Sequence, residues 1–244
     1  MVFIYYKKMR KNYAVIAAGG LGTRLKDLKE NKHTKVLIEI NGLSMISTQI
    51  KQLKSWGYEE FIIITNPEFN DLIIQDVSEN YSDLKIDFVV QEHPRGIADA
   101  LSYAEPLIED DSLVTFILGD NFFGKNPVSD INFEKFNGAQ IFVLDVDNPE
   151  EFGVIELDHQ NNILDLHEKP KTYFSSFAIV GIYVYEKICF ELIKQLKPSS
   201  RGELEITDLN KLYLDKNLLN FKLIDSWWID AGTEERINKL KELF

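Results

Sequence analysis

From residue 13 to about residue 138, short runs of apolar residues alternate with longer amphipathic segments. Continuous apolar runs are typical of strands buried on both faces of a parallel sheet, and apolar positions three or four residues apart predict helices. This pattern predicts helices at 44–56, 68–80 and 97–108, and strands at 13–18, 61–65, 86–91 and 113–118.

The second half of the chain has shorter segments that are more typical of strands. Its pattern predicts helices at 187–195, 204–214 and from 234 onward, and strands at 139–145, 153–158, 163–167, 178–185, 219–224 and 226–229. The order of elements predicts an α/β fold with one Rossmann-like, doubly wound, mixed and mostly parallel sheet. We expect a single domain after an extension at 1–12, with the second half adding mixed sheet as the far wall of a cleft.

Charge and cysteine content narrow the class of protein. The chain has 244 residues and a formal net charge of −12, which argues against nucleic acid as the main partner. The single cysteine, Cys189, suits a reducing compartment and is expected to pack as a small apolar side chain. Because no apolar run reaches the ~20 residues that a membrane span needs, we expect a cytoplasmic protein. Either Met1 or Met9 is compatible with the native start.

A glycine-rich segment follows the first predicted strand. Gly19, Gly20 and Gly22 lack Cβ atoms, so their backbone amides can approach anionic oxygens, and Arg24 adds a fixed positive charge. The spacing matches neither the dinucleotide fingerprint nor the P-loop. The segment therefore indicates either a polyphosphate site or a simple tight turn.

Two aspartates follow apolar, strand-like runs. Asp120 comes after 113–118, and Asp230 comes after the run near the carboxyl end. Carboxylates beside a polyphosphate are the ligands that Mg²⁺ prefers. Spacing alone is also compatible with two ordinary helix caps or turn formers.

Further charged residues lie near predicted strand ends. Glu168 and Lys169 are adjacent, and Lys35 is either a phosphate contact or a surface lysine. Arg201 precedes a helix whose glutamates are explained by the positive helix start. No histidine lies at metal-ligand spacing to another, so a zinc enzyme or a triad hydrolase has no support.

Segments of this chain resemble the sugar-1-phosphate nucleotidyltransferase family, most closely its glucose-1-phosphate thymidylyltransferase branch. In order, these segments are 19–25, 91–98, 118–121, 149–154, 168–170, 197–208 and 228–233. The last two are the most specific, reading Lys-Pro-Ser-Ser-Arg-Gly-Glu-Leu-Glu-Ile-Thr-Asp and Trp-Ile-Asp-Ala-Gly-Thr. The resemblance implies a GT-A-like nucleotidyltransferase fold over 13–244, with a mainly nucleotide-binding half at 13–138 and a mainly sugar-binding half at 139–232.

The resemblance also implies a role for each matching residue. The nucleotide would contact Gly19, Gly20, Gly22, Thr23, Arg24, Gln91, Gly96 and Asp120. The sugar phosphate would contact Asn121, Gly153, Glu168, Lys169 and Arg201. Catalysis would depend on Arg24, Lys35 and Lys169, and Mg²⁺ would be held by Asp120 and Asp230.

The implied substrates are a nucleoside triphosphate, dTTP or UTP, and a hexose 1-phosphate such as glucose 1-phosphate. The sugar phosphate attacks the α-phosphorus, giving an NDP-sugar and pyrophosphate. Because the attacking phosphate is already anionic, the protein needs only to hold two anions together and to stabilise the charge that shifts. CTP, other hexose phosphates and N-acetylglucosamine 1-phosphate with UTP remain open.

The chain departs from the family pattern in places. Lys26-Asp27-Leu28 replaces a usual Pro-x-Thr, Leu43-Ser44 replaces a Lys-Pro, and Val180 replaces a threonine near the sugar. The sequence ends without the long helical tail of many relatives, so we do not expect their tetramer or regulatory site, and a homodimer remains open. A non-catalytic nucleotide-sugar-binding relative should have lost one or more of Arg24, Asp120, Lys169 and Asp230, and all four are present. A nicotinamide oxidoreductase would need a different glycine spacing.

Overall fold

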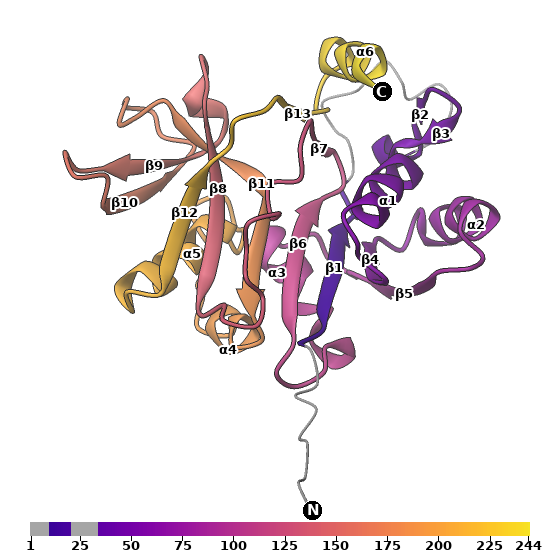
Figure 1. Ribbon diagram of the computed structural model, residues 1–244, viewed down its shortest axis with the longest axis horizontal. Coiled ribbons are helices and arrows are strands. Elements are labelled where there is room, and N and C mark those ends of the chain that lie inside the picture. Colours follow the sequence, from indigo (N-terminus) through magenta and orange to yellow (C-terminus); the bar gives the residue numbers. More distant parts are fainter. Residues whose placement is uncertain (1–9, 21–33) are drawn as a thin grey trace, which may run out of the picture.

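A nine-stranded mixed sheet forms the centre of the computed structural model, which describes residues 10–20 and 34–244 (Figure 1). The strands follow the order β10-β9-β11-β6-β1-β4-β5, while β8 pairs with β11 and β12 pairs with β8. Their bounds are β1 Asn12–Ala17, β4 Glu60–Thr65, β5 Lys85–Val90, β6 Leu113–Leu118, β8 Ala139–Asp145, β9 Gly153–Leu157, β10 Ile163–Glu168, β11 Phe177–Glu186 and β12 Leu219–Leu223. The predicted mixed α/β sheet is confirmed.

The nucleotide-binding half predicted from the sequence contains the parallel strands β6, β1, β4 and β5. In the β1–β6 register Ala17 lies beside Leu118, and in the β1–β4 register it lies beside Ile64. The carboxyl ends of these strands therefore meet at one edge, which is uppermost in Figure 1. In open sheets of this kind, ligands bind at that edge.

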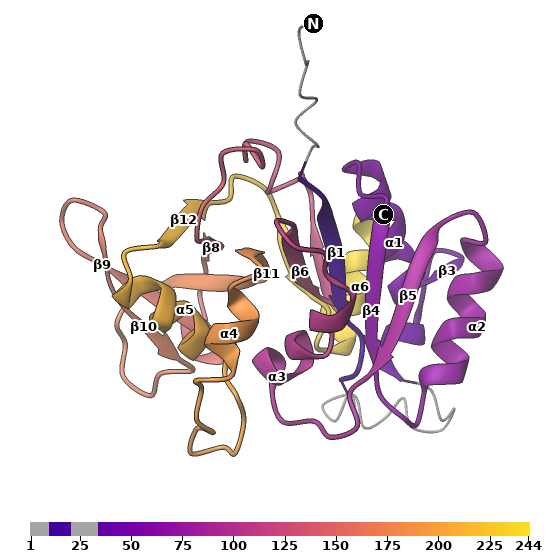
Figure 2. The same ribbon diagram turned by 90° about the horizontal axis from the view of Figure 1, so that it is seen from below.

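Helices cover both faces of the sheet, as a doubly wound fold requires (Figure 2). Alternate residues of β1 point to opposite faces of the sheet. Ile16 packs in a hydrophobic cluster with residues of α1 and α2. Val15 packs in a second cluster with residues of α3, α4 and α5. The helix bounds are α1 Met45–Ser55, α2 Asn70–Asn80, α3 Ile97–Ser102, α4 Cys189–Ile193 and α5 Ile206–Asp215.

The long strand β11 joins the two halves. It pairs antiparallel with β6 on one side, and with β8 and β9 on the other. Its side chains from Ala178 to Tyr185 are all buried, which explains the continuous apolar run in the sequence. Because one sheet continues through β11, the two halves form facing walls above its edge.

Some predicted elements differ in extent. The helix predicted at 97–108 ends at Ser102 and is followed by a 3-10 turn, η3 (Glu105–Leu107). Pro106 lies in that turn, and proline lacks the N–H that a continuing α-helix would need. Five short elements were not predicted: η2 Lys35–Leu37, β2 Glu39–Ile40, β3 Leu43–Ser44, β7 Asn121–Phe123 and η4 Pro149–Glu151.

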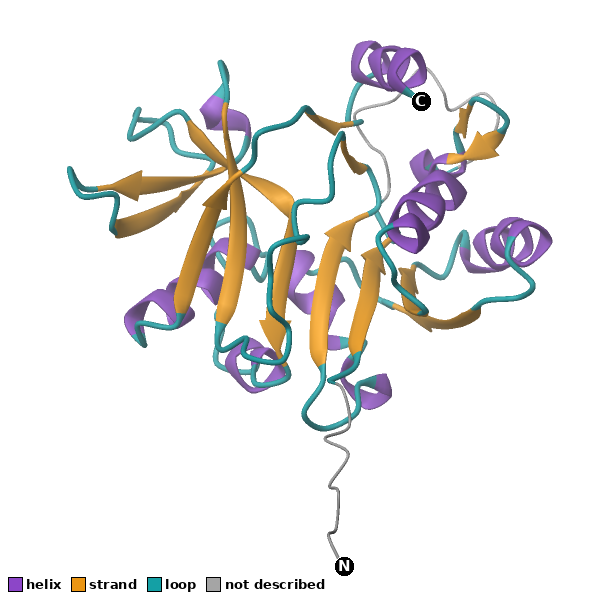
Figure 3. Ribbon diagram, in the orientation of Figure 1, coloured by secondary structure: helices purple, strands orange, loops and turns teal. Residues whose placement is uncertain are grey.

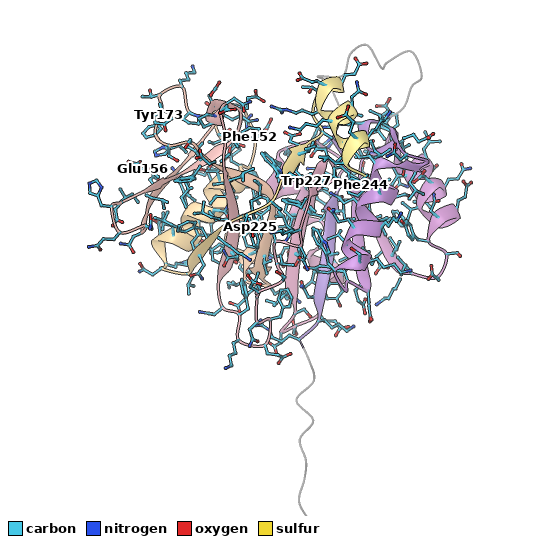
Figure 4. The ribbon with its side chains drawn as sticks, turned by 45° about the horizontal axis from the view of Figure 1, so that its top comes forward. Phe152, Glu156, Tyr173, Asp225, Trp227 and Phe244 are labelled. Carbon is cyan, nitrogen blue, oxygen red and sulfur yellow. The ribbon has the colours of Figure 1, made fainter. Side chains whose placement is uncertain are left out.

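The last helix, α6 (Glu234–Leu243), lies above the edge where the parallel strands end, close to β7 and β13 (Trp228–Asp230) (Figure 3). The ring of Phe244 packs edge-on against Trp227, with centroids 6.0 Å apart, and Figure 4 shows the two side chains together beneath this helix. Phe244 also packs against Phe122, at 5.7 Å. These contacts fix the helix to the short β7–β13 ribbon.

Within the described part of the chain, no helix is both long enough and apolar enough to span a membrane.

Candidate active site

A cavity of about 420 Å³ opens at the carboxyl ends of the parallel strands, between the two halves. Residues from both halves of the chain line it. Those that the sequence analysis singled out are Gly19, Gly20, Lys35, Gln91, Gly96, Asp120, Asn121, Gly153, Glu168, Lys169 and Asp230. The structure thus brings most of the predicted site residues around one space, although they come from both ends of the chain.

The glycine-rich segment is described only at its start. Gly22, Thr23 and Arg24 lie outside the described residues, as do the departures at 26–28. The carbonyl of Gly19 accepts a hydrogen bond from the Asn66 side chain at 3.0 Å. A Cβ on Gly19 would lie only 3.1 Å from the Thr65 carbonyl oxygen, so β4 packs closely beneath this segment.

Asp120 and Asp230 are brought together by an antiparallel pair of short strands. In the β7–β13 register Asp230 pairs with Asn121, and the Ala231 amide donates to the Asp120 carbonyl at 2.8 Å. The Lys35 ammonium group hydrogen-bonds the Asp120 carboxylate and lies 4.0 Å from Asp230 Oδ1. Two carboxylates therefore converge on one cation at the wall of the cavity, an arrangement of oxygen ligands that suits a divalent metal.

Asn121 is almost fully buried and its side chain connects three elements. Its amide oxygen accepts from the Gly181 backbone at 3.0 Å and from the Trp228 indole at 2.7 Å. Its amide nitrogen donates to Asp120 Oδ1 at 2.7 Å. These bonds hold the Asp120 carboxylate in place, a function that the sequence reasoning did not foresee beside the predicted sugar contact.

Gln91 and Gly96 lie on the loop between β5 and α3. A Cβ on Gly96 would lie 2.5 Å from the Leu204 carbonyl oxygen, and the φ angle of Gly96 is +109°, so only glycine fits there without strain. The Leu204 amide in turn donates to the Arg95 carbonyl at 2.7 Å. Close packing against the segment before α5 thus accounts for this glycine, independently of any ligand.

Glu168 lies at the end of β10, beside the first turn of α5. Its carboxylate accepts a hydrogen bond from Thr207 Oγ1 at 2.5 Å, and burial raises the pKa of this carboxyl above its usual range. Gly153 lies opposite, where a Cβ would be 2.8 Å from Thr207 Oγ1 and 3.3 Å from Glu168 Oε2. The three residues form a compact polar wall.

Arg201 lies beside this wall and not on the cavity surface. Its guanidinium contacts three carboxylates, at 3.2 Å for Glu168, 3.3 Å for Glu203 and 2.7 Å for Glu205. The structure therefore shows Arg201 neutralising acidic side chains, and its predicted contact with a sugar phosphate stays a prediction.

Lys169 has an unusual backbone. Its φ angle is +43°, which is uncommon for a residue other than glycine, and its amide donates to the Phe152 carbonyl at 2.9 Å. Strained backbone of this kind persists where the surrounding structure fixes it, often at functional sites. Lys169 is one of the residues that line the cavity, and its ammonium group lies 3.9 Å from Glu168 Oε1.

Some lining residues were not singled out from the sequence, although their segments were. Trp228 lines the cavity and packs edge-on against Phe152, with ring centroids 5.1 Å apart. Glu151 also lines it and forms an ion pair with Arg236 of α6 at 2.9 Å. Val180 is fully buried within the core cluster under α1, so its replacement of a threonine does not alter the cavity surface.

Comparison with known proteins shows the family. The family model described as "Nucleotidyl transferase" matches residues 13–242. A glucose-1-phosphate thymidylyltransferase from Neisseria gonorrhoeae is 36% identical over 232 residues, covering 92% of this chain and 80% of that protein.

Solved structures give the same result for the fold. A provisionally assigned glucose-1-phosphate thymidylyltransferase from Bacillus anthracis, crystallised with a sucrose, superimposes with a TM-score of 0.85 at 34% identity, covering 95% of this chain and 94% of that one. A UDP-glucose pyrophosphorylase complexed with UDP-glucose has a TM-score of 0.81 at 20% identity, covering 96% of this chain and 98% of that one. At that identity the likeness concerns the fold alone.

The chain belongs to the nucleotidyl transferase family. Members to which it is similar include enzymes that carry the name glucose-1-phosphate thymidylyltransferase.

Proposed function

We propose that this chain is a sugar-1-phosphate nucleotidyltransferase that transfers a pyrimidine nucleotidyl group from dTTP or UTP to a hexose 1-phosphate such as glucose 1-phosphate. The observation that supports this most is that a single cavity has two different walls. Glycines and Gln91 line it on the side of β1, and Glu168 and Lys169 line it on the side of β9 and β10. The names of the similar proteins agree with this assignment.

The nucleotide would bind along the parallel strands. Its phosphates would lie against Gly19 and Gly20, and we propose phosphate contacts for Gly22, Thr23 and Arg24 from the sequence, since these three lie outside the described residues. The pyrimidine ring would lie against Gln91 and Gly96. Lys35, which is mostly buried at the wall of the cavity, would contact the phosphates from the side.

The sugar phosphate would bind in the other half. Gly153, Asn121 and Glu168 would contact its hydroxyl groups. The Glu168 carboxylate is suited to this contact because it already accepts a hydrogen bond from the Thr207 hydroxyl group. Lys169 would hold the phosphate, assisted by Arg201. The bond that forms joins a sugar-phosphate oxygen to the α-phosphorus, and the bond that breaks releases pyrophosphate.

Residues around the reacting phosphates act by position and charge. Lys35 and Lys169 would stabilise negative charge on the two substrates and keep them in line, which is how phosphoryl-group transfers are generally accelerated. No proton has to be removed from the attacking oxygen, because a sugar 1-phosphate is anionic at neutral pH. We therefore assign no general base.

Enzymes of this family generally use a divalent metal, and we propose Mg²⁺ at Asp120 and Asp230. The fit rests on the donor set, since both carboxylates approach the same ammonium group. When bound, Mg²⁺ would supply positive charge to the phosphate oxygens of the nucleotide. Asn121 would keep Asp120 oriented toward it.

A panel of triphosphates and sugar phosphates tests the proposal. Purified protein with Mg²⁺ is mixed with dTTP, UTP, CTP, ATP or GTP, each with glucose 1-phosphate or N-acetylglucosamine 1-phosphate, and pyrophosphate release is followed. Release that needs both substrates, with dTTP or UTP preferred, would support the proposal. Lack of release with every pair, while the triphosphates bind, would favour a non-catalytic relative.

A further inference from the structure

We propose that Asp99 is a positioning residue that sets base specificity, by fixing the Gln91 carboxamide so that its oxygen faces the nucleotide. The base site would then select the imide ring of uracil or thymine over cytosine. This inference rests on the proposed function, in which Gln91 contacts a pyrimidine base. Asp99 itself lies behind Gln91 and is not assigned any contact with the substrate.

The contact between the two side chains is short and buried. Gln91 Nε2 donates to Asp99 Oδ2 at 2.8 Å, and more weakly to the Gly96 carbonyl at 3.4 Å. Gln91 is 7% exposed and Asp99 is 3% exposed. An ionised carboxylate only accepts hydrogen bonds, so it fixes which end of the carboxamide faces it.

Asp99 is held in place from its other side. Its Oδ1 accepts a hydrogen bond from Arg95 Nη2 at 2.9 Å, and its backbone lies in the first turn of α3. The Arg95 side chain is 62% exposed, so it reaches Asp99 from the surface. Rotation of the carboxylate away from Gln91 would break a charged pair as well as a hydrogen bond.

The remaining atom of the carboxamide lies toward the glycine-rich wall. Gln91 Oε1 would be 3.6 Å from a Cβ placed on Gly19, and both residues line the cavity. Among the described residues no group donates a hydrogen bond to this oxygen. Gln91 therefore offers its ligand an acceptor and not a donor.

The ring chemistry of the bases makes this orientation selective. With the ribose or deoxyribose on N1, uracil and thymine have one ring donor, the imide N3–H, whereas cytosine has a lone pair on N3. An acceptor facing N3 forms a hydrogen bond with uracil or thymine, and opposes a second acceptor in cytosine. Leaving such buried polar groups unmatched costs roughly a ten- to hundredfold loss of affinity.

Asp99→Asn tests the orientation because an asparagine can present either an oxygen or an amino group to Gln91. In the variant the Gln91 carboxamide can rotate and meet either base. Asp76→Asn is the matched control, since the Asp76 carboxylate accepts hydrogen bonds from the hydroxyl groups of Ser44 and Ser47 away from the cavity. Melting temperatures of all proteins check that the variants are folded.

The readout is the ratio of kcat/KM for UTP and dTTP to that for CTP, with one sugar phosphate. We expect a ratio of roughly ten or more in the wild-type protein and in Asp76→Asn, and a ratio within a fewfold of one in Asp99→Asn. A folded Asp99→Asn protein that loses rate equally with all three nucleotides, or a wild-type protein that prefers CTP, overturns the inference.

Equilibrium binding of UTP and CTP to the same proteins separates this inference from the proposed function. A wild-type protein that releases no pyrophosphate contradicts the proposed function. The binding ratio still tests Asp99 in that case, since it should fall in Asp99→Asn and remain unchanged in Asp76→Asn. An unchanged binding ratio in Asp99→Asn overturns the inference whether or not the protein is active.

Discussion

The Lys35 ammonium group hydrogen-bonds the carboxylate of Asp120, and it lies 4.0 Å from Asp230 as well. Lys35 comes from the turn after the glycine-rich segment, while the two aspartates come from the β7–β13 ribbon and the strand end beside it. Lys35 thus contacts both carboxylates at the edge where the two substrates would meet, and Arg236 Nη1 lies 3.9 Å from Asp230 Oδ2 as well. The proposed catalysis depends on this cluster.

Asp120→Asn should lower turnover by ~100-fold or more, which is the scale of losing one preorganised electrostatic contact. The amide keeps the size of the side chain but removes the charge that we assign to the metal site. Steady-state pyrophosphate release measures the effect. Asp130→Asn is the control, because Asp130 pairs with Lys222 on the surface at 2.7 Å. Turnover close to the wild-type value in Asp120→Asn would refute the metal assignment.

Gln91→Ala should raise the KM for the nucleotide and leave kcat little changed. Its carboxamide would contact the base, which is remote from the reacting phosphates, so its loss weakens binding in ground state and transition state alike. Initial rates at varied dTTP concentration give both constants. Gln75→Ala provides the control, since Gln75 is exposed on α2 and, among the residues that the structure describes, its side chain hydrogen-bonds only Glu79. A fall in kcat with an unchanged KM would remove Gln91 from the base site.

The KM for the sugar phosphate should rise as the pH falls through the raised pKa of Glu168. The ionised carboxylate accepts hydrogen bonds from sugar hydroxyls, and burial makes it protonate at a higher pH than an ordinary glutamate. Folding responds in the opposite direction. Because the folded state raises the pKa of Glu168, protonation of this carboxyl favours the folded state, and its contribution to stability increases as the pH falls through that raised pKa.

The pH profile is compared with that of Glu168→Gln, because the sugar phosphate itself titrates near pH ~6. The part of the profile that is due to Glu168 should be missing in this variant, which should show a raised KM already at neutral pH. Identical profiles for the two proteins would show that Glu168 does not take part in sugar binding.

Gly96→Ala should destabilise the protein by about 1–3 kcal/mol more than Gly42→Ala. Both glycines have positive φ angles, +109° and +91°, so alanine is strained at each. Only at Gly96 would the new Cβ meet backbone, 2.5 Å from the Leu204 carbonyl oxygen, while nothing lies within 4 Å at Gly42. Chemical denaturation of both variants gives the two free energies of unfolding. Equal losses would show that this close packing is readily relieved.

Much of the fold could be predicted because its signals are local. Buried strands such as β4 and β6 are continuous apolar runs, and helices such as α1 show their apolar face in the sequence. The helix predicted at 97–108 is too long because its apolar spacing continues past Ser102, whereas Pro106 in the following 3-10 turn cannot continue an α-helix. The division of the domain at residue 138 stays a prediction.

The site was less accessible from the sequence because it depends on pairing between distant segments. Apolar runs placed Asp120 and Asp230 at strand ends, but their approach depends on β7, which has only three residues and no periodic signal. Val180 was expected to affect the sugar side, yet the alternation of β11 directs it into the core. Likewise the contact between Gln91 and Asp99 joins a strand end to a helix, and no local pattern marks it.

The central claim is that the sugar phosphate attacks the α-phosphorus of the nucleotide within this cavity. The most direct measurement uses glucose 1-phosphate with ¹⁸O in its three non-bridging phosphate oxygens, with dTTP, Mg²⁺ and the wild-type protein, and mass spectrometry of the products. We predict a dTDP-sugar that retains all of the label and a pyrophosphate that contains none. Label in the released pyrophosphate, or no nucleoside diphosphate sugar with any triphosphate and sugar phosphate of the panel, would contradict this claim.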